Sequence, residues 1–150
     1  MNWLRSMLVL LAALLGTLLA RTAVTDQSVR FQAVDIFIDS KETPLAAYQL
    51  EFSSRNGDAK VVGVEGGEHP AFKEAPFYDP KAIQHERVII GAFNTTSGGH
   101  LPKGKTRVAT IHLQITRERN PDYALKVETA ATLEGRKIVV ETTYVERKPE

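Results

Sequence analysis

The amino-acid sequence predicts an all-β domain, a β-sandwich of about seven to nine strands, behind an apolar N-terminal segment. Three observations lead to this prediction. Apolar residues alternate with polar ones at a period of two in several stretches, most clearly in residues 46–53. Clusters of glycine, asparagine and proline separate these stretches at short intervals. No stretch shows the convincing spacing of apolar side chains that marks an amphipathic helix.

Length and composition fit a single domain. The chain has 150 residues, of which 43% are hydrophobic and 25% charged, as in an ordinary globular protein with one core. The formal net charge is +1, so charge gives no reason to expect nucleic acid or anionic lipid as a partner. The chain has no cysteine, which excludes disulfides, thiolate metal sites and cysteine nucleophiles.

Residues 1–23 are predicted to be a signal peptide or an N-terminal membrane anchor. A short region with Arg5 precedes an uncharged apolar run of fourteen residues, 7–20. A bilayer span needs about twenty, so the run suits a signal peptide cleaved after Ala20 or Ala23. Neither position has a clean small-x-small pattern, and an uncut anchor helix remains the alternative. In both cases residues 24–150 form the domain, which is predicted to be exported: periplasmic, extracellular or anchored to the envelope.

The first half of the domain is predicted to hold three strands. Residues 31–39 and 46–53 alternate between apolar and polar, and residues 61–64 are a β-branched run. A turn at Asn56-Gly57-Asp58 supplies positive-φ chemistry between the second and third strands. The inward-facing residues of the first two strands are expected to be Val34, Ile36, Ile38, Ala46, Tyr48, Leu50 and Phe52.

An irregular stretch and further strands follow the glycine corner Gly66-Gly67. Residues 68–85 have three prolines and little periodicity, which predicts a long excursion with one helical turn at 80–85. Residues 87–93 are almost continuously apolar, which predicts a central strand covered on both faces. After a loop at 94–105, residues 106–116 alternate again. The expected inward set of this strand is Ala109, Ile111, Leu113 and Ile115, opposed to Val108, Thr110, His112 and Gln114.

The C-terminal part is predicted to be a pair of strands, 123–133 and 137–145, joined at Glu134-Gly135-Arg136. The alanines of residues 123–132 would also allow a helix. Val127 and Thr129 favour the strand, because β-branched side chains fit a pleated sheet better than a helix.

In this order the features resemble the cohesin domain, a member of the cohesin and carbohydrate-binding-module β-sandwich superfamily. The strand AAYQLEF is followed by AKVVGVEGG, an irregular loop, RVIIGAFN, a glycine-rich loop and TRVATIHLQIT. Gly104 followed by residues 108–115 resembles the family's phrase before its penultimate strands. The resemblance covers about residues 34–145. Many cohesins carry a Tyr-Asp-Pro phrase directly after the first of these strands, whereas Tyr78-Asp79-Pro80 lies farther along this chain.

The resemblance implies a jelly-roll type, cohesin-like sandwich and a non-catalytic module that recognises a protein, such as a dockerin-like partner, or a polysaccharide. Phe72, Phe77 and Tyr78 in the irregular excursion could form an exposed stacking platform. Alternatively, they fold back and plug one end of the sandwich. The predicted binding set consists of Phe72, Phe77, Tyr78, Asn94, Thr95 and His100.

Other kinds of site find less support. The four histidines lack the spacing of a preformed zinc site. Aspartates Asp58, Asp79 and Asp122 are interpreted as turn caps, and calcium is the less favoured alternative because no Asp-x-Asp-x-Asp run occurs. No Gly-x-Ser-x-Gly elbow or nucleotide-binding glycine cluster is present. We therefore predict no metal, no cofactor and no enzymatic activity, and rank a small hydrolase last.

Two functions remain open from the sequence. The first is an exported binding module with a protein or glycan partner. The second is a structural or assembly subunit of a cell-envelope complex, held in the membrane by residues 1–23.

Overall fold

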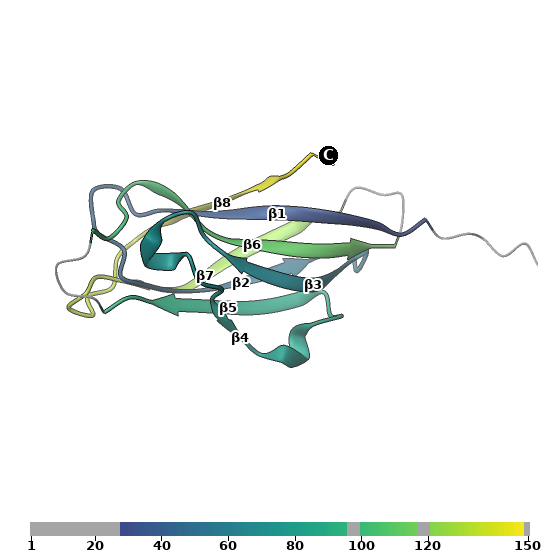
Figure 1. Cartoon of the computed structure of the whole chain (residues 1–150), viewed down its shortest axis with the longest axis horizontal. Coiled ribbons are helices and arrows are strands. Elements are labelled where there is room, and N and C mark those ends of the chain that lie inside the picture. Colours follow the sequence, from purple (N-terminus) through teal and green to yellow (C-terminus); the bar gives the residue numbers. More distant parts are fainter. Residues whose placement is uncertain (1–27, 96–99, 117–120, 149–150) are drawn as a thin grey trace, which may run out of the picture.

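The computed structural model describes residues 28–95, 100–116 and 121–148. They form eight strands and two short 3-10 turns (Figure 1). The elements are β1 (Arg30–Asp39), β2 (Ala47–Ser54), β3 (Ala59–Gly66), η2 (Pro70–Phe72), β4 (Phe77–Tyr78), η3 (Pro80–Ala82), β5 (Arg87–Phe93), β6 (Lys105–Ile115), β7 (Tyr123–Ala131) and β8 (Glu141–Glu146). The predicted all-β class is confirmed. The helical alternative for residues 123–132 is wrong, because β7 occupies them.

The strands make two antiparallel sheets of four that pack on each other (Figure 1). The order is β3-β6-β1-β8 in one sheet, called the β1 sheet below, and β4-β5-β2-β7 in the other, called the β2 sheet. The predicted signal or anchor at residues 1–23 lies outside the described residues. Within the described residues, no helix is long and apolar enough to cross a membrane.

The core between the sheets contains the residues that the period-two pattern selected, but Val108 of the expected opposite face of β6 is also fully buried, because a bulge interrupts the β1–β6 register beside it. Every inward residue predicted for the first two strands is at most 3% exposed, and Ala109, Ile111, Leu113 and Ile115 of β6 are fully buried. Burying one large aliphatic or aromatic side chain contributes about 1.5–3 kcal/mol. The alternation therefore both forms the strands and fixes which face of each sheet is inside.

β5 departs from the prediction. Val88 and Ile90 are buried, but Ile89 is 37% and Phe93 64% exposed. The prediction that this strand is covered on both faces is therefore wrong. Its sheet is antiparallel and has one face on the core and one in solvent, so the apolar residues on the second face stay exposed.

The predicted pairing of the two C-terminal strands is also wrong. β7 pairs with β2, and β8 pairs with β1 in the other sheet. One isolated bridge, between Ala131 and Lys137, is what remains of the expected hairpin. Beyond it, Ile138 and Val140 pack against the core. Burial of these two side chains takes the chain across the edge of the sandwich instead of back along β7.

The glycine corner after β3 is a point of close backbone approach. A Cβ atom on Gly66 would lie 2.0 Å from the Lys73 carbonyl oxygen, and one on Gly67 would lie 2.2 Å from that of Arg107. Gly67 N–H donates to the Phe72 carbonyl at 2.7 Å. The following excursion therefore folds tightly back on the corner, and no larger residue fits there.

We expect Gly66→Ala to lower the free energy of unfolding by at least about 2 kcal/mol, because backbone atoms must move to admit the methyl group. Gly63→Ala in the same strand is the matched control. A Cβ there meets nothing nearer than His112 at 3.8 Å, so we expect a change below about 1 kcal/mol. Urea unfolding measures both values, and equal losses in the two variants would contradict the close-approach interpretation.

Candidate functional site

The excursion between β3 and β5 is held by its own caps and by β3. The His69 ring nitrogen Nδ1 accepts from Ala71 N–H at 3.1 Å, and Asp79 accepts from Lys81 N–H at 2.9 Å. Val61 of β3 donates to the His85 carbonyl at 2.8 Å and accepts from Gln84 N–H at 2.7 Å. The irregular excursion with a turn near residue 80 is thus confirmed, and its backbone is fixed at several points.

The three aromatic residues of the excursion take different positions. Phe72 is 2% exposed and packs edge-on against Tyr48, with ring centroids 5.3 Å apart. Tyr78 is half-buried and packs against the core. Phe77 is 74% exposed. The plug interpretation is therefore correct for Phe72, whereas Phe77 is free for contact with another molecule.

Phe77 lies beside a second exposed aromatic ring, that of Phe93. β4 adds to the edge of β5 with Phe77 opposite Gly91, which places Phe93 on the diagonal of the same face. The two ring centroids are 6.0 Å apart and the ring planes differ by 15°. Gly91 has no side chain, so nothing rises from the sheet between the two rings.

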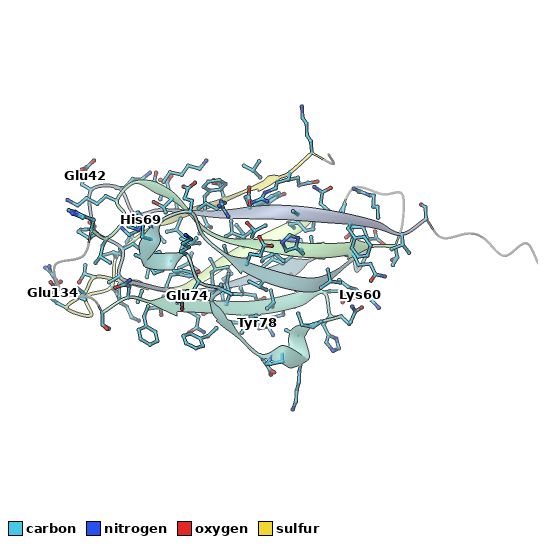
Figure 2. The ribbon with its side chains drawn as sticks, in the orientation of Figure 1. Glu42, Lys60, His69, Glu74, Tyr78 and Glu134 are labelled. Carbon is cyan, nitrogen blue, oxygen red and sulfur yellow. The ribbon has the colours of Figure 1, made fainter. Side chains whose placement is uncertain are left out.

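A pocket of about 280 Å³ adjoins this aromatic pair. Phe77 and Phe93 line it together with Phe72, Glu74 and Asn94. Figure 2 shows Glu74 close to the end of β5. Three of the pocket's ten lining residues are aromatic, and the others are two prolines, three alanines, the exposed carboxylate of Glu74 and the amide of Asn94.

Paired charges border the aromatic pair on the same sheet face. Arg87 Nη2 donates to Glu51 Oε2 at 2.6 Å, and Lys126 Nζ lies 2.6 Å from Glu128 Oε1. The hydrogen bond from Arg87 lowers the pKa of the Glu51 carboxyl below its ordinary value. Each positive group of these two pairs thus has a negative neighbour, while the exposed carboxylate of Glu74 adds a negative group beside the rings.

The predicted binding residues do not all meet at one site. Asn94 lines the aromatic pocket, and its amide Nδ2 donates to the Ala71 carbonyl at 3.2 Å. Thr95 is exposed and directly precedes residues 96–99, which lie outside the described residues. His100 lines a different pocket, of about 470 Å³, together with Lys103 and Arg136.

Phe93 is the site residue that the sequence interpretation missed. Residues 87–93 are nearly all apolar, which predicts a strand covered on both faces and so hides Phe93 as a surface residue. The available signal was the alternation within this run, which puts Ile89, Gly91 and Phe93 on the face opposite Val88 and Ile90. Only the position of the neighbouring strands tells which of the two faces is in solvent.

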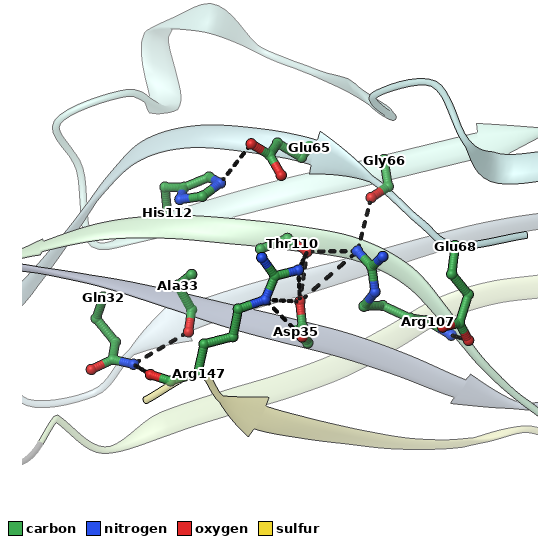
Figure 3. A network of polar contacts seen from close by, with 10 residues as sticks. All are labelled: Gln32, Ala33, Asp35, Glu65, Gly66, Glu68, Arg107, Thr110, His112 and Arg147. Carbon is green, nitrogen blue, oxygen red and sulfur yellow. Dashed lines mark hydrogen bonds and ion pairs between the residues drawn. The ribbon is translucent and has the colours of Figure 1, made fainter. Parts of the chain in front are cut away.

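A second polar cluster lies on the outer face of the β1 sheet (Figure 3). Asp35 accepts from Arg147 Nε at 3.0 and 3.1 Å and from the Thr110 hydroxyl at 2.6 Å. Arg107 Nη1 donates to Thr110 Oγ1 at 2.8 Å and to the Gly66 carbonyl at 3.3 Å. These donors and acceptors bond one another. The cluster of Asp35, Arg107, Thr110 and Arg147 is called the clasp below, because it holds the chain at the end of β8 against the sheet.

The same region has no arrangement of metal ligands. His112 Nε2 lies 3.0 Å from Glu65 Oε1, but a pair is too few for a metal site. Within the described ranges, no group of three or more His, Asp or Glu side chains is placed to hold a metal ion. The calcium alternative therefore gains no support from these residues.

Comparisons of the chain with protein-family models, curated proteins and solved structures find no match. The class of protein is therefore inferred from the fold and from the exposed aromatic pair.

The clasp predicts a specific pH dependence of stability. Burial raises the pKa of Asp35, but hydrogen bonds from Arg147 and Thr110 and the nearby arginine charges lower it by more, so the net pKa is below its ordinary value. A depressed carboxyl pKa stabilises the fold above the unfolded-state value of about 4, and this is lost as the pH falls through the folded-state pKa. Asp35→Asn should therefore cost about 1–3 kcal/mol at pH 7 and flatten the loss of stability in acid.

Asp122→Asn is the control, because the ion pair of Asp122 with Arg55 is long, 3.5 Å, and exposed. It should change the free energy of unfolding by less than about 1 kcal/mol. Denaturant unfolding from pH 7 down to pH 2 tests both variants. An Asp35→Asn curve parallel to that of the unmodified chain would contradict the clasp.

Proposed function

We propose that the domain is an exported, non-catalytic binding module that holds a protein partner against the outer face of the β2 sheet. One observation carries the proposal: Phe77 and Phe93 stack on each other in solvent, 74% and 64% exposed. Exposed aromatic side chains that cluster are typical of the central, energetically dominant part of a protein interface. The resemblance to cohesin domains supports the same class of protein.

The surroundings of the pair also suit a protein interface. Ile89 extends the apolar surface along β5, Ala47 lies opposite Phe93, and the exposed Gln49 side chain lies beside Gly91. The paired charges Glu51–Arg87 and Lys126–Glu128 lie at the border. An apolar centre within a polar rim is the usual anatomy of a protein–protein contact.

A polysaccharide is the less favoured partner. Sugar recognition needs polar groups that are free to bond hydroxyls beside the stacked ring. Here the two ion pairs on the same sheet face are already formed, and the Asn94 amide donates to a backbone carbonyl of the excursion, so few polar groups beside the rings, such as the Glu74 carboxylate, are available to a sugar. A protein partner that packs an apolar side chain on the two rings leaves these hydrogen bonds and ion pairs in place.

Phe77→Ala and Phe93→Ala should each weaken partner binding by roughly 30-fold, since truncating a dominant interface residue costs about 2 kcal/mol or more. Phe31→Ala is the matched control, because Phe31 is 69% exposed on β1 in the other sheet. The immobilised full chain is used to capture proteins from the exported fraction of the source cells. The captured protein is then purified and titrated against each variant.

All three variants remove an exposed ring and should change the free energy of unfolding by less than about 1 kcal/mol. A partner that binds Phe77→Ala as tightly as Phe31→Ala would contradict the proposed surface. A panel of purified polysaccharides runs in parallel. Retention on a polysaccharide that is lost in Phe77→Ala, with no protein captured, would replace the protein partner by a glycan.

A further inference from the structure

The four edge strands of the two sheets are protected to different degrees. An edge strand has unpaired backbone groups, and proteins guard them by covering the edge, shortening it or adding a bulge. β3 is covered at Val61 by residues 84–85 and has a bulge between Val61 and Gly63. β4 has two residues. β7 has an irregular register opposite Gln49 and Leu50, where Glu128 is the extra residue.

β8 has none of these protections. Its six residues pair with β1 in consecutive register without a bulge. The strand has neither proline nor glycine, and Thr142 to Val145 are residue types with high strand propensity. Within the described ranges, β1 is the one strand that pairs with it. Alternate N–H and C=O groups of β8 therefore point away from the sheet, where a further strand could bond them.

A groove lies beside this edge, between β8 and β7. Its volume is about 390 Å³, and Arg55, Leu125 and the rings of Tyr123 and Tyr144 line it. The two tyrosine rings meet edge to face, with centroids 5.5 Å apart. Tyr123 is 3% exposed, and its hydroxyl has no hydrogen-bond partner among the described residues. A strand added at β8 would place alternate side chains in this groove, next to a buried donor that lacks an acceptor.

The charges of β8 indicate which kind of strand could pair with its free edge. Glu141 and Glu146 stand at its two ends, and no basic residue lies between them. Glu141 also forms an exposed ion pair with Lys41, at 3.0 Å. A second copy of β8, paired antiparallel about the centre of the strand, would put Glu141 opposite Glu146 at both ends. Like charges in directly opposed positions destabilise a sheet. A strand with a basic residue near each end has the complementary pattern.

We propose that the free edge of β8 is a β-augmentation site, which binds an extended peptide segment with a basic residue near each end. The backbone edge requires a polypeptide in extended form, because only a strand offers N–H and C=O groups at matching spacing. This surface is separate from the Phe77–Phe93 face, and the proposal does not depend on the proposed function.

The probe is the synthetic peptide acetyl-Lys-Thr-Val-Thr-Val-Lys-amide, compared with the same peptide carrying Glu at both ends. NMR titration of the purified full chain should show saturable shifts of the amides of residues 142–145 and their protection from exchange. The Glu-ended peptide should bind at least tenfold more weakly. Glu146→Lys should abolish this preference, because each peptide then meets one like and one opposite charge at the ends of β8. Glu86→Lys makes the same charge change at an exposed position in the loop that covers β3, and should leave it unaltered.

A second measurement does not depend on the variants. Methylating the amide nitrogens of alternate residues gives two forms of the Lys-ended peptide. One form keeps the N–H groups that face β8 and should bind, while the other should lose at least tenfold. Shifts confined to residues outside β7 and β8, or equal binding of the two methylated forms, would overturn the proposal. A dimer of the free chain that involves the amides of β8 would also overturn it, in favour of a second copy as the occupant.

Discussion

The close backbone approach at Gly66-Gly67 is the constraint on which the candidate site depends. The corner has the carbonyls of Lys73 and Arg107 where a side chain would be, so the chain after β3 must fold back at once. That return places Phe72 over Tyr48, whose hydroxyl donates to the Val108 carbonyl at 3.1 Å. Phe72 is thereby buried. The backbone then continues to the edge of β5, where the next aromatic residue, Phe77, lies on the solvent face of the sheet.

The solvent faces of the two sheets differ in their chemistry. The outer face of the β1 sheet carries Asp35, Thr110 and two arginines that bond one another (Figure 3). The polar groups of this face are satisfied internally and offer a partner little to gain, although the face also exposes the ring of Phe31. The outer face of the β2 sheet instead exposes a stacked aromatic pair, with two ion pairs on the same face. This asymmetry is the reason for assigning partner binding to the β2 sheet.

The clasp and the β8 edge belong together physically. β8 is largely exposed and contributes little to the core, so the contacts of its C-terminal end matter for holding it in register. Arg147 makes these contacts, with the Asp35 carboxylate through its side chain and with the Ala33 carbonyl through its N–H at 2.9 Å. A strand fixed in this way can present an ordered edge without being covered, which is what β-augmentation needs.

Local residue patterns determined much of this protein. The period-two alternation defined most strands and the buried faces of β1 and β2, and the prolines marked the irregular excursion. These features follow from neighbours in sequence, because side chains alternate across a strand whatever it pairs with. The sequence also pointed to Phe77 as a binding residue, though together with Phe72, which is buried.

Tertiary structure alone decided which strands pair and which faces meet water. The segments 123–133 and 137–145 are predicted to pair with each other, yet β7 and β8 join different sheets, and the partly buried Ile138 and Val140 between them pack against the core. The exposure of Ile89 and Phe93 likewise follows from the one-sided burial of the β2 sheet. An apolar run fits a covered strand and a strand with an apolar outer face equally well. The partnership of Phe77 with Phe93 and the free edge of β8 both arise from the sheet order, which no local pattern contains.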